Sequence, residues 1–216
     1  MAHLLLFDLM DTVLVDPFFP AIRSFLDDEG IRTWVSLRTP GVFEAFEKGE
    51  ISEREYFRRF FTTEELPSHI PPIHRLKKRM FQSVRFRPGL QDLLSRLAED
   101  PGIKLGIASN YSAWYHSVLE KRPELERYFD LFFFSCEMGV RKPDPAYFDA
   151  IEASLPEFLP NPQSVWFFDD RPANLGPARK RGWNAHLIGI KSNEERDSAA
   201  IQEEFLNPLR QAGVVE

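Results

Sequence analysis

Residues 3–12 read His-Leu-Leu-Leu-Phe-Asp-Leu-Met-Asp-Thr, a short apolar run that stops at a carboxylate. A continuous apolar run of this length is typical of a parallel strand that is buried on both faces of a sheet. Two later runs follow the same plan, at 103–108 and 165–168. The polar residues that end the three runs are Asp8, then Ser109 and Asn110, then Asp169 and Asp170.

Segments of helical period separate these runs. Residues 89–98, 113–122, 145–154 and 173–181 have helical spacing, and 131–134 and 185–190 are weaker strand candidates. Strands that alternate with helices predict an α/β fold, a parallel sheet between layers of helices. Near the carboxyl end, the spacing of Ile201, Phe205 and Leu209 predicts a further helix docked on the core.

One region breaks the alternation. Between about residues 17 and 85 there is no convincing strand, and we expect helices near 19–29, 40–48, 52–61 and 73–81. Ser52 followed by Glu55 is a capping-box signature for the third of these. We therefore predict a core formed by residues 1–15 and 86–216, with an all-helical cap at 16–85 that is well placed to cover a site at the sheet's edge.

Composition limits the kinds of partner. The chain has 216 residues and a net charge of −6, which argues against nucleic acid or an anionic membrane as its main partner. No apolar run is long enough to span a bilayer, and Cys136, the single cysteine, excludes an internal disulfide. With no leader pattern at residues 1–8, we expect a cytoplasmic protein, either a monomer or a homodimer.

The residues at the predicted strand ends suit phosphoryl chemistry. Ligands of an open α/β sheet bind beyond the carboxyl ends of its strands, where Asp8, Ser109 and Asp170 are expected. Carboxylates hold magnesium, a hydroxyl binds phosphate oxygens, and Lys142 can neutralise the charge beside a carboxylate nucleophile. The sequence therefore predicts a magnesium-dependent site for a small phosphorylated molecule.

Four motifs in order make a resemblance specific: Phe-Asp8-Leu-Met-Asp-Thr, Ala-Ser109-Asn, Arg-Lys142-Pro-Asp-Pro and Phe-Phe-Asp169-Asp-Arg-Pro-Ala-Asn174. Together they resemble the haloacid-dehalogenase-like hydrolase superfamily. The resemblance implies a Rossmann-like three-layer core, a mobile helical cap and an aspartyl-phosphate on Asp8. It implies that Ser109 binds phosphate and Lys142 balances charge. It assigns magnesium to Asp8, the backbone carbonyl of Met10, Asp169 and Asp170, with Asn174 as a helper.

The first motif departs from the superfamily's phosphatases, which carry a second aspartate two residues after the nucleophile. Here Met10 holds that position, and a thioether can neither protonate a leaving group nor activate water. Three interpretations stay open. Asp11 or solvent takes the acid–base role, the protein is a metal-free 2-haloacid dehalogenase, or it is a catalytically weak protein that binds a phosphorylated ligand.

A narrower resemblance favours the first interpretation. The run from Phe7 to Phe18, together with Phe46-Glu-Lys-Gly, looks like the plant plastid flavin mononucleotide hydrolases, which share the Met-Asp variant. It offers flavin mononucleotide as the best single substrate. Aromatic residues after Ser109 are compatible with a planar ring. The expected substrate contacts are Ser109, Asn110, Tyr111, Trp114, Arg171 and Asn174.

Overall fold

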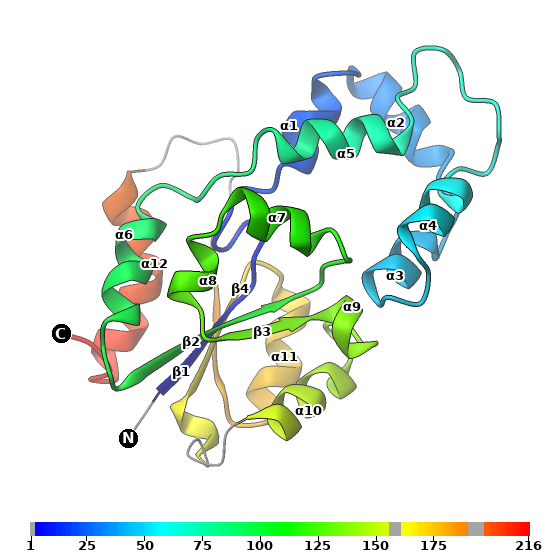
Figure 1. Ribbon diagram of the computed structural model, residues 1–216. Coiled ribbons are helices and arrows are strands. Elements are labelled where there is room, and N and C mark those ends of the chain that lie inside the picture. The colour runs from blue at the N-terminus through cyan, green and yellow to red at the C-terminus, as the bar shows by residue number, and fades with distance from the viewer. Residues whose placement is uncertain (1–2, 156–160, 190–196) are drawn as a thin grey trace.

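A five-stranded parallel sheet forms the centre of the protein in the computed structural model, which describes residues 3–155, 161–189 and 197–216. The strands run in the order β3-β2-β1-β4-β5. Their bounds are β1 (His3–Phe7), β2 (Ile103–Ser109), β3 (Leu131–Phe134), β4 (Val165–Asp169) and β5 (Asn184–Leu187). The predicted α/β fold is confirmed, and the three strands with polar ends lie side by side at its centre (Figure 1).

Helices cover both faces of the sheet because successive side chains of a strand point to opposite sides. Leu5 and Phe7 of β1 share one buried cluster with residues of α6 (Leu90–Ala98), α7 (Tyr115–Lys121), α8 (Leu125–Tyr128) and α12 (Ser198–Gln211). Leu4 and Leu6 share the other cluster with α10 (Pro145–Ser154) and α11 (Pro172–Lys180). The predicted docking of the last helix is confirmed, since Ile201, Phe205 and Leu209 are buried.

The helical insertion lies beyond the carboxyl ends of the strands (Figure 1). It contains α1 (Phe18–Arg23), α2 (Asp28–Ser36), α3 (Val42–Glu47), α4 (Glu53–Arg59) and α5 (Ile73–Phe81). The two crossing segments are tied together, since the backbone N–H of Val15 donates to the Arg85 carbonyl at 3.0 Å. We propose residues 16–85 as the cap.

The sequence pattern placed some element ends wrongly. The single helix expected at 19–29 is two helices, because the Asp27 side chain accepts a hydrogen bond from Gly30 N at 2.8 Å and starts α2 there. Strand β5 ends at Leu187, whereas we predicted a strand to Ile190, which lies outside the described residues. The capping box of Ser52 and Glu55 is confirmed at the start of α4.

A short helix, α9 (Ser135–Met138), follows β3 and meets the cap. Within the described residues, no helix is long and apolar enough to cross a membrane. The α3–α4 turn lies against α9, and the backbone of Gly49 (φ +70°) comes so close that a Cβ built there would be 2.3 Å from the carbonyl oxygen of Cys136. Glycine at this turn therefore permits the close contact between cap and core.

We predict that Gly49→Ala destabilises the protein more than Gly41→Ala does. Gly41 has a similar φ of +76°, yet a Cβ there meets nothing within 4 Å. Gly41→Ala should therefore cost only the left-handed backbone strain, about 1–2 kcal/mol. Gly49→Ala adds a clash with backbone and should cost more. Urea unfolding of both variants measures the difference, and equal losses would show that the close contact is not retained in solution.

Candidate active site

The buried ammonium of Lys142 joins three strand ends. Its Nζ donates to Asp8 Oδ1 at 2.8 Å, to Asp169 Oδ2 at 2.5 Å and to the Ala108 carbonyl at 2.6 Å. An ammonium has three N–H groups, so all three are used. The Lys142 side chain is 1% exposed. Burial alone would lower the pKa of Lys142, but the two carboxylates outweigh it and raise that pKa.

Asp169 is a buried hydrogen-bond acceptor that helps to hold Lys142 in place. Its carboxylate is fully buried and accepts hydrogen bonds from Asn174 Nδ2 at 2.9 and 3.0 Å and from Arg171 N at 2.8 Å, in addition to Lys142. These contacts argue against Asp169 as a magnesium ligand, and that role stays a prediction. Its two oxygens are already occupied, and it does not line the pocket in which Asp8 and Asp170 lie.

Asn110 fixes the backbone of Lys142. Its Nδ2 donates to the Lys142 carbonyl and its Oδ1 accepts from the Lys142 N–H, both at 2.8 Å. Both ends of the Asn110 amide thus position the lysine, while contact of Asn110 with a substrate stays a prediction.

A small polar pocket of about 50 Å³ lies over this arrangement. We call it the phosphoryl pocket. It is lined by Asp8, Met10, Asp11, Asp16, Glu47, Ser109, Asn110, Lys142, Asp170, Arg171 and Asn174. Of the predicted site residues, it brings together Asp8, Met10, Asp11, Ser109, Asn110, Lys142, Asp170, Arg171 and Asn174. Five of the lining residues are carboxylic acids, whereas only Lys142 and Arg171 carry positive charge.

This excess of carboxylates fits a divalent cation. Burial, followed by the charges of Asp8 and Asp169, raises the pKa of Asp170 to about 7. Burial also raises the pKa of Asp8, while the charge of Lys142 opposes the rise. In the part of the chain that the structure describes, no three His, Cys, Asp or Glu side chains form a metal cluster. Magnesium needs fewer, since it is commonly bound by one or two carboxylates, waters and substrate phosphate.

Asp11 is held within the loop that follows β1. Its φ is +58°, and its Oδ1 accepts the backbone N–H of Asp16 at 2.9 Å. Arg87 supports the same loop by donating to the Asp11 carbonyl at 3.2 Å. The Asp11 side chain reaches the phosphoryl pocket, but one of its oxygens closes the loop. An acid–base role for Asp11 stays a prediction.

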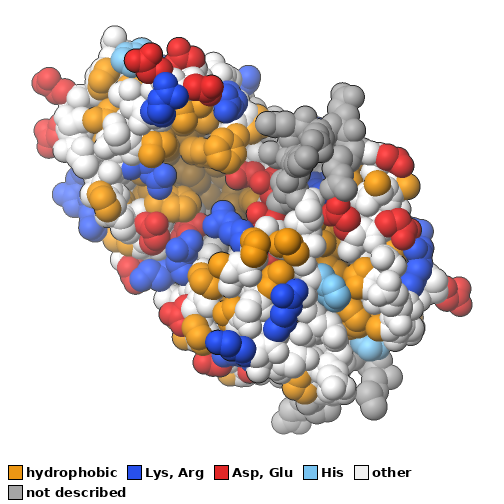
Figure 2. Space-filling model, turned by 180° about the vertical axis from the view of Figure 1, so that it is seen from behind, with side chains coloured by type: hydrophobic (Ala, Val, Ile, Leu, Met, Phe, Trp, Pro, Cys, Tyr) orange, Lys and Arg blue, Asp and Glu red, His pale blue; other side chains and the backbone are white. Residues whose placement is uncertain are grey.

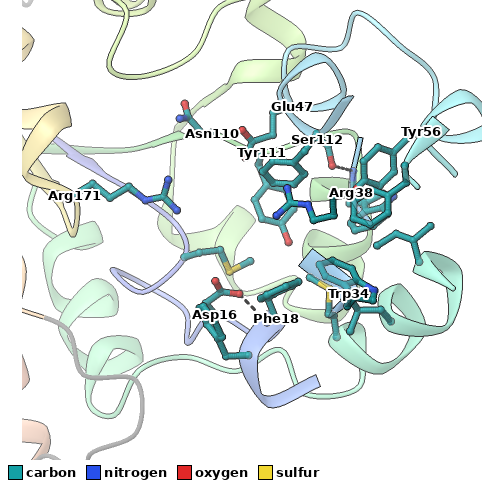
Figure 3. Close-up of a pocket in the computed structure, with 18 residues that line it drawn as sticks. Asp16, Phe18, Trp34, Arg38, Glu47, Tyr56, Asn110, Tyr111, Ser112 and Arg171 are labelled. Carbon is teal, nitrogen blue, oxygen red and sulfur yellow. Dashed lines mark hydrogen bonds between the residues drawn. The ribbon is translucent and has the colours of Figure 1, made fainter. Parts of the chain in front are cut away.

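A larger aromatic cavity of about 290 Å³ continues from the phosphoryl pocket into the cap. The two share Met10, Asp16, Glu47, Asn110 and Arg171 as lining residues. Its aromatic walls are Phe18, Phe19, Trp34, Phe43, Tyr56, Phe60, Tyr111 and Trp114. Figure 3 shows the Arg171 side chain extending toward the cavity from the core side and Arg38 extending toward Tyr111. Figure 2 shows a hollow lined by hydrophobic side chains between the cap and the core.

The sequence pattern predicted Tyr111 and Trp114 in this region but missed three polar residues of the cap segment. Glu47, Arg38 and Asp16 line the cavity, and Glu47 and Asp16 also reach the phosphoryl pocket. Glu47 belongs to the Phe46-Glu-Lys-Gly stretch, where a carboxylate two residues before a glycine turn was the available signal. No spacing rule relates it to Asp8, because the contact depends on how the cap docks.

We predict that Lys142→Met lowers the free energy of unfolding of the metal-free protein at pH 7 by about 3–5 kcal/mol, because it leaves buried carboxylates unpaired. The loss should shrink as the pH falls from 7 to 5. Without the ammonium, the folded-state pKa of Asp8 lies further above its unfolded value, so protonation relieves the penalty. Denaturant titrations with chelator measure both effects.

Lys104→Met is the matched control. Lys104 forms an exposed pair with Asp130 at 3.2 Å, so its loss should cost less than about 1 kcal/mol. A Lys142→Met variant that behaves like this control, or whose deficit grows on acidification, contradicts the buried ion-pair network.

Comparison with known proteins agrees with the geometry. The chain is 33% identical over 172 residues to flavin mononucleotide hydrolase 1 of Arabidopsis thaliana, a match that covers 80% of this chain and 66% of that protein. It is 26% identical over 151 residues to a phosphorylated carbohydrates phosphatase of Thermotoga maritima, covering 64% of this chain and 67% of that one. The chain thus spans about two thirds of the length of these two relatives.

The fold is shared with solved structures. A haloacid dehalogenase-family enzyme of Bacteroides thetaiotaomicron, crystallised with magnesium and inorganic phosphate, superposes with a TM-score of 0.66 at 21% identity, over 92% of this chain and 99% of that one. The family profile described as haloacid dehalogenase-like hydrolase matches residues 3–182. With the buried lysine, the strand-end carboxylates and the helical insertion in place, the chain belongs to the haloacid dehalogenase-like hydrolase family.

Proposed function

We propose that this protein is a magnesium-dependent phosphatase that hydrolyses a small phosphate monoester, with flavin mononucleotide as the best single substrate. One observation carries the proposal: the phosphoryl pocket, with Asp8 and Lys142 in its wall, continues into an aromatic cavity large enough for a ring system. The polar end suits a phosphoryl group and the aromatic end suits its leaving group.

In the reaction we propose, an Asp8 carboxylate oxygen attacks phosphorus and the bond to the leaving oxygen breaks, which leaves an aspartyl-phosphate. Water then attacks that phosphorus, and Asp8 is released with inorganic phosphate. We expect Ser109 to bind a phosphate oxygen, because it lines the phosphoryl pocket and its hydroxyl donates to Asp8. Lys142 fixes the nucleophile's orientation through the 2.8 Å contact and balances charge as phosphate enters.

Asp8, Asp170 and the backbone carbonyl of Met10 are the groups that would hold magnesium. The ion would supply positive charge between the carboxylate nucleophile and the anionic phosphate. The carboxylates of Asp8 and Asp170 favour this chemistry over metal-free dehalogenation, because a dehalogenase would have no use for a second, half-buried carboxylate in the same pocket.

The cavity supports a planar, heteroaromatic leaving group. Its walls carry eight aromatic side chains, and the Arg38 guanidinium lies over the rings of Trp34, Phe43 and Phe60 at 5.5–5.7 Å. Faces of this kind stack on flat rings. The similarity to the Arabidopsis flavin mononucleotide hydrolase supports a flavin as this group. We expect only this small molecule as a partner, and the cytoplasmic location and oligomeric state stay predictions.

Asp8→Asn should abolish magnesium-dependent phosphate release from flavin mononucleotide, because an amide oxygen is a poor nucleophile. We would measure phosphate release from flavin mononucleotide, sugar phosphates and p-nitrophenyl phosphate, with magnesium and with chelator. Wild-type release should vanish with chelator. Release that persists in chelator or in Asp8→Asn contradicts the proposed mechanism, and no release from any substrate by the wild type contradicts the function.

Phe19→Ala should raise KM for flavin mononucleotide about threefold to tenfold, the value of one lost aromatic contact. Phe19 lines the aromatic cavity and is 50% exposed, so its loss should disturb the fold little. KM for glycerol phosphate, which has no ring, should stay unchanged. Val35→Ala is the control, because Val35 is 48% exposed in the same cap but does not line the cavity. An equal effect on both substrates contradicts ring binding at this wall.

A further inference from the structure

The position where a second aspartate would serve as acid and base holds Met10, whose side chain lines the phosphoryl pocket. An alkyl phosphate has a poor leaving group that needs a proton as its bond to phosphorus breaks. Water must also lose a proton when it attacks the aspartyl-phosphate. If the proposed phosphatase activity holds, which this inference assumes, another group in the pocket performs both transfers.

Three carboxylic acids of the pocket are not used as nucleophile or proposed metal ligand: Asp11, Asp16 and Glu47. Two of them belong to the loop after β1 and serve its backbone. Asp11 Oδ1 accepts from Asp16 N at 2.9 Å, and Asp16 Oδ1 accepts from Phe18 N at 2.8 Å. These bonds tie each side chain to its own loop. Burial raises the pKa of Asp16 to about 6, although the hydrogen bond from Phe18 N opposes the rise, so Asp16 is the alternative that the test below must exclude.

Glu47 reaches the pocket from the opposite side, at the end of α3 in the cap. Its backbone is anchored to the core, because Ser135 Oγ donates to the Glu47 carbonyl at 2.6 Å. The residue is 7% exposed and lines both the phosphoryl pocket and the aromatic cavity (Figure 3). Glu47 is therefore one of the residues at the junction through which a leaving group would run from phosphate into the cavity.

The Glu47 carboxylate is held but not saturated. Its Oε2 lies 2.7 Å from Nη2 of Arg141, yet among the described residues no donor makes a hydrogen bond to this buried oxygen. Burial raises the pKa of Glu47 to about 7, with Arg141 and Arg171 opposing the rise and Glu44 and Asp8 adding to it. Near neutral pH this carboxyl can therefore both donate and accept a proton. The other ionisable groups around it are Asp11, Asp16, Lys142 and Asp170 in the pocket and Arg38, Tyr56 and Tyr111 in the cavity.

We propose that Glu47 of the cap is the acid–base catalyst that replaces the aspartate missing at Met10. In the first step Asp8 forms its bond to phosphorus, the bond from phosphorus to the leaving oxygen breaks, and that oxygen takes the proton of the Glu47 carboxyl. In the second step the Glu47 carboxylate takes a proton from the attacking water, and the bond between phosphorus and Asp8 breaks. Glu47 is then protonated again, and the cycle is balanced.

The test compares two leaving groups. Glu47→Gln should lower kcat/KM for flavin mononucleotide, an alkyl phosphate, by about 10²-fold or more, because its leaving alkoxide needs the proton. It should change kcat/KM for p-nitrophenyl phosphate only a few-fold, because nitrophenolate leaves without one. With p-nitrophenyl phosphate the variant should also show a burst followed by slow turnover, since the second step lacks its base.

Three further variants separate catalysis from cap docking. Glu50→Gln, an exposed carboxylate in the same turn, is the matched control and should change neither substrate. Arg141→Gln breaks the ion pair but keeps the carboxyl, so the dependence on leaving group should persist. Because Arg141 lowers the pKa of Glu47, its removal should move the alkaline fall of kcat/KM for flavin mononucleotide to higher pH. Asp16→Asn should change kcat/KM for the two substrates by the same factor.

Several results overturn the proposal. Equal losses on both substrates in Glu47→Gln, or the same losses in Arg141→Gln, would make Glu47 a docking contact only. If Asp16→Asn or Asp11→Asn, and not Glu47→Gln, lowers kcat/KM for flavin mononucleotide much more than for p-nitrophenyl phosphate, the acid–base catalyst lies in the loop after β1. If the wild-type protein releases no phosphate in the presence of magnesium, the phosphatase assignment is wrong, and this inference is wrong with it. That result is distinguishable from the others because it appears before any variant is measured.

Discussion

The fully buried ammonium of Lys142 is the contact on which the rest of the site depends. It uses its three protons on the end of β1 through Asp8, on the end of β2 through the Ala108 carbonyl and on the end of β4 through Asp169. A lysine can lie at this depth only because two carboxylates offset its desolvation. The same contacts orient Asp8, so the interaction that permits burial also positions the nucleophile. Asn110 and Asn174 complete the arrangement by fixing the lysine backbone and the Asp169 carboxylate.

The core and the cap each supply part of the site. Core residues line most of the phosphoryl pocket, whereas cap residues line most of the aromatic cavity. Glu47 belongs to both, and its ion pair with Arg141 and the Ser135 contact hold the α3 end against the core. Gly49 permits that approach at the level of the backbone. A cap that carries a proton-transferring carboxyl would couple chemistry to docking, since the reaction could proceed only when the leaving group is enclosed.

Much of this arrangement could be predicted from sequence, because it depends on local pattern. Short apolar runs that end in Asp8, Ser109 and Asp169 identified the three central strands, and parallel strands bring their ends together. The division of the 19–29 segment was missed, because α1 ends at Arg23 and the Asp27 side chain caps the start of a second helix within the same helical pattern. Asp169 and Asp170 are adjacent and chemically identical. The sequence therefore does not show that Asp169 is buried against Lys142, whereas Asp170 lines the pocket. Glu47 could not be assigned to the site from sequence, because its position depends on contacts between the cap and Ser135 and Arg141 of the core, which are distant in the chain.

The central claim is that Asp8 becomes phosphorylated during turnover. Mass spectrometry of the enzyme quenched in acid while it hydrolyses flavin mononucleotide tests this most directly. The aspartyl-phosphate should accumulate most when its hydrolysis, the second step, is slowed. The account predicts one phosphoryl group on the peptide that contains Asp8, and none when magnesium is chelated. Turnover with no modified peptide, or with the phosphoryl group on another residue, would contradict it.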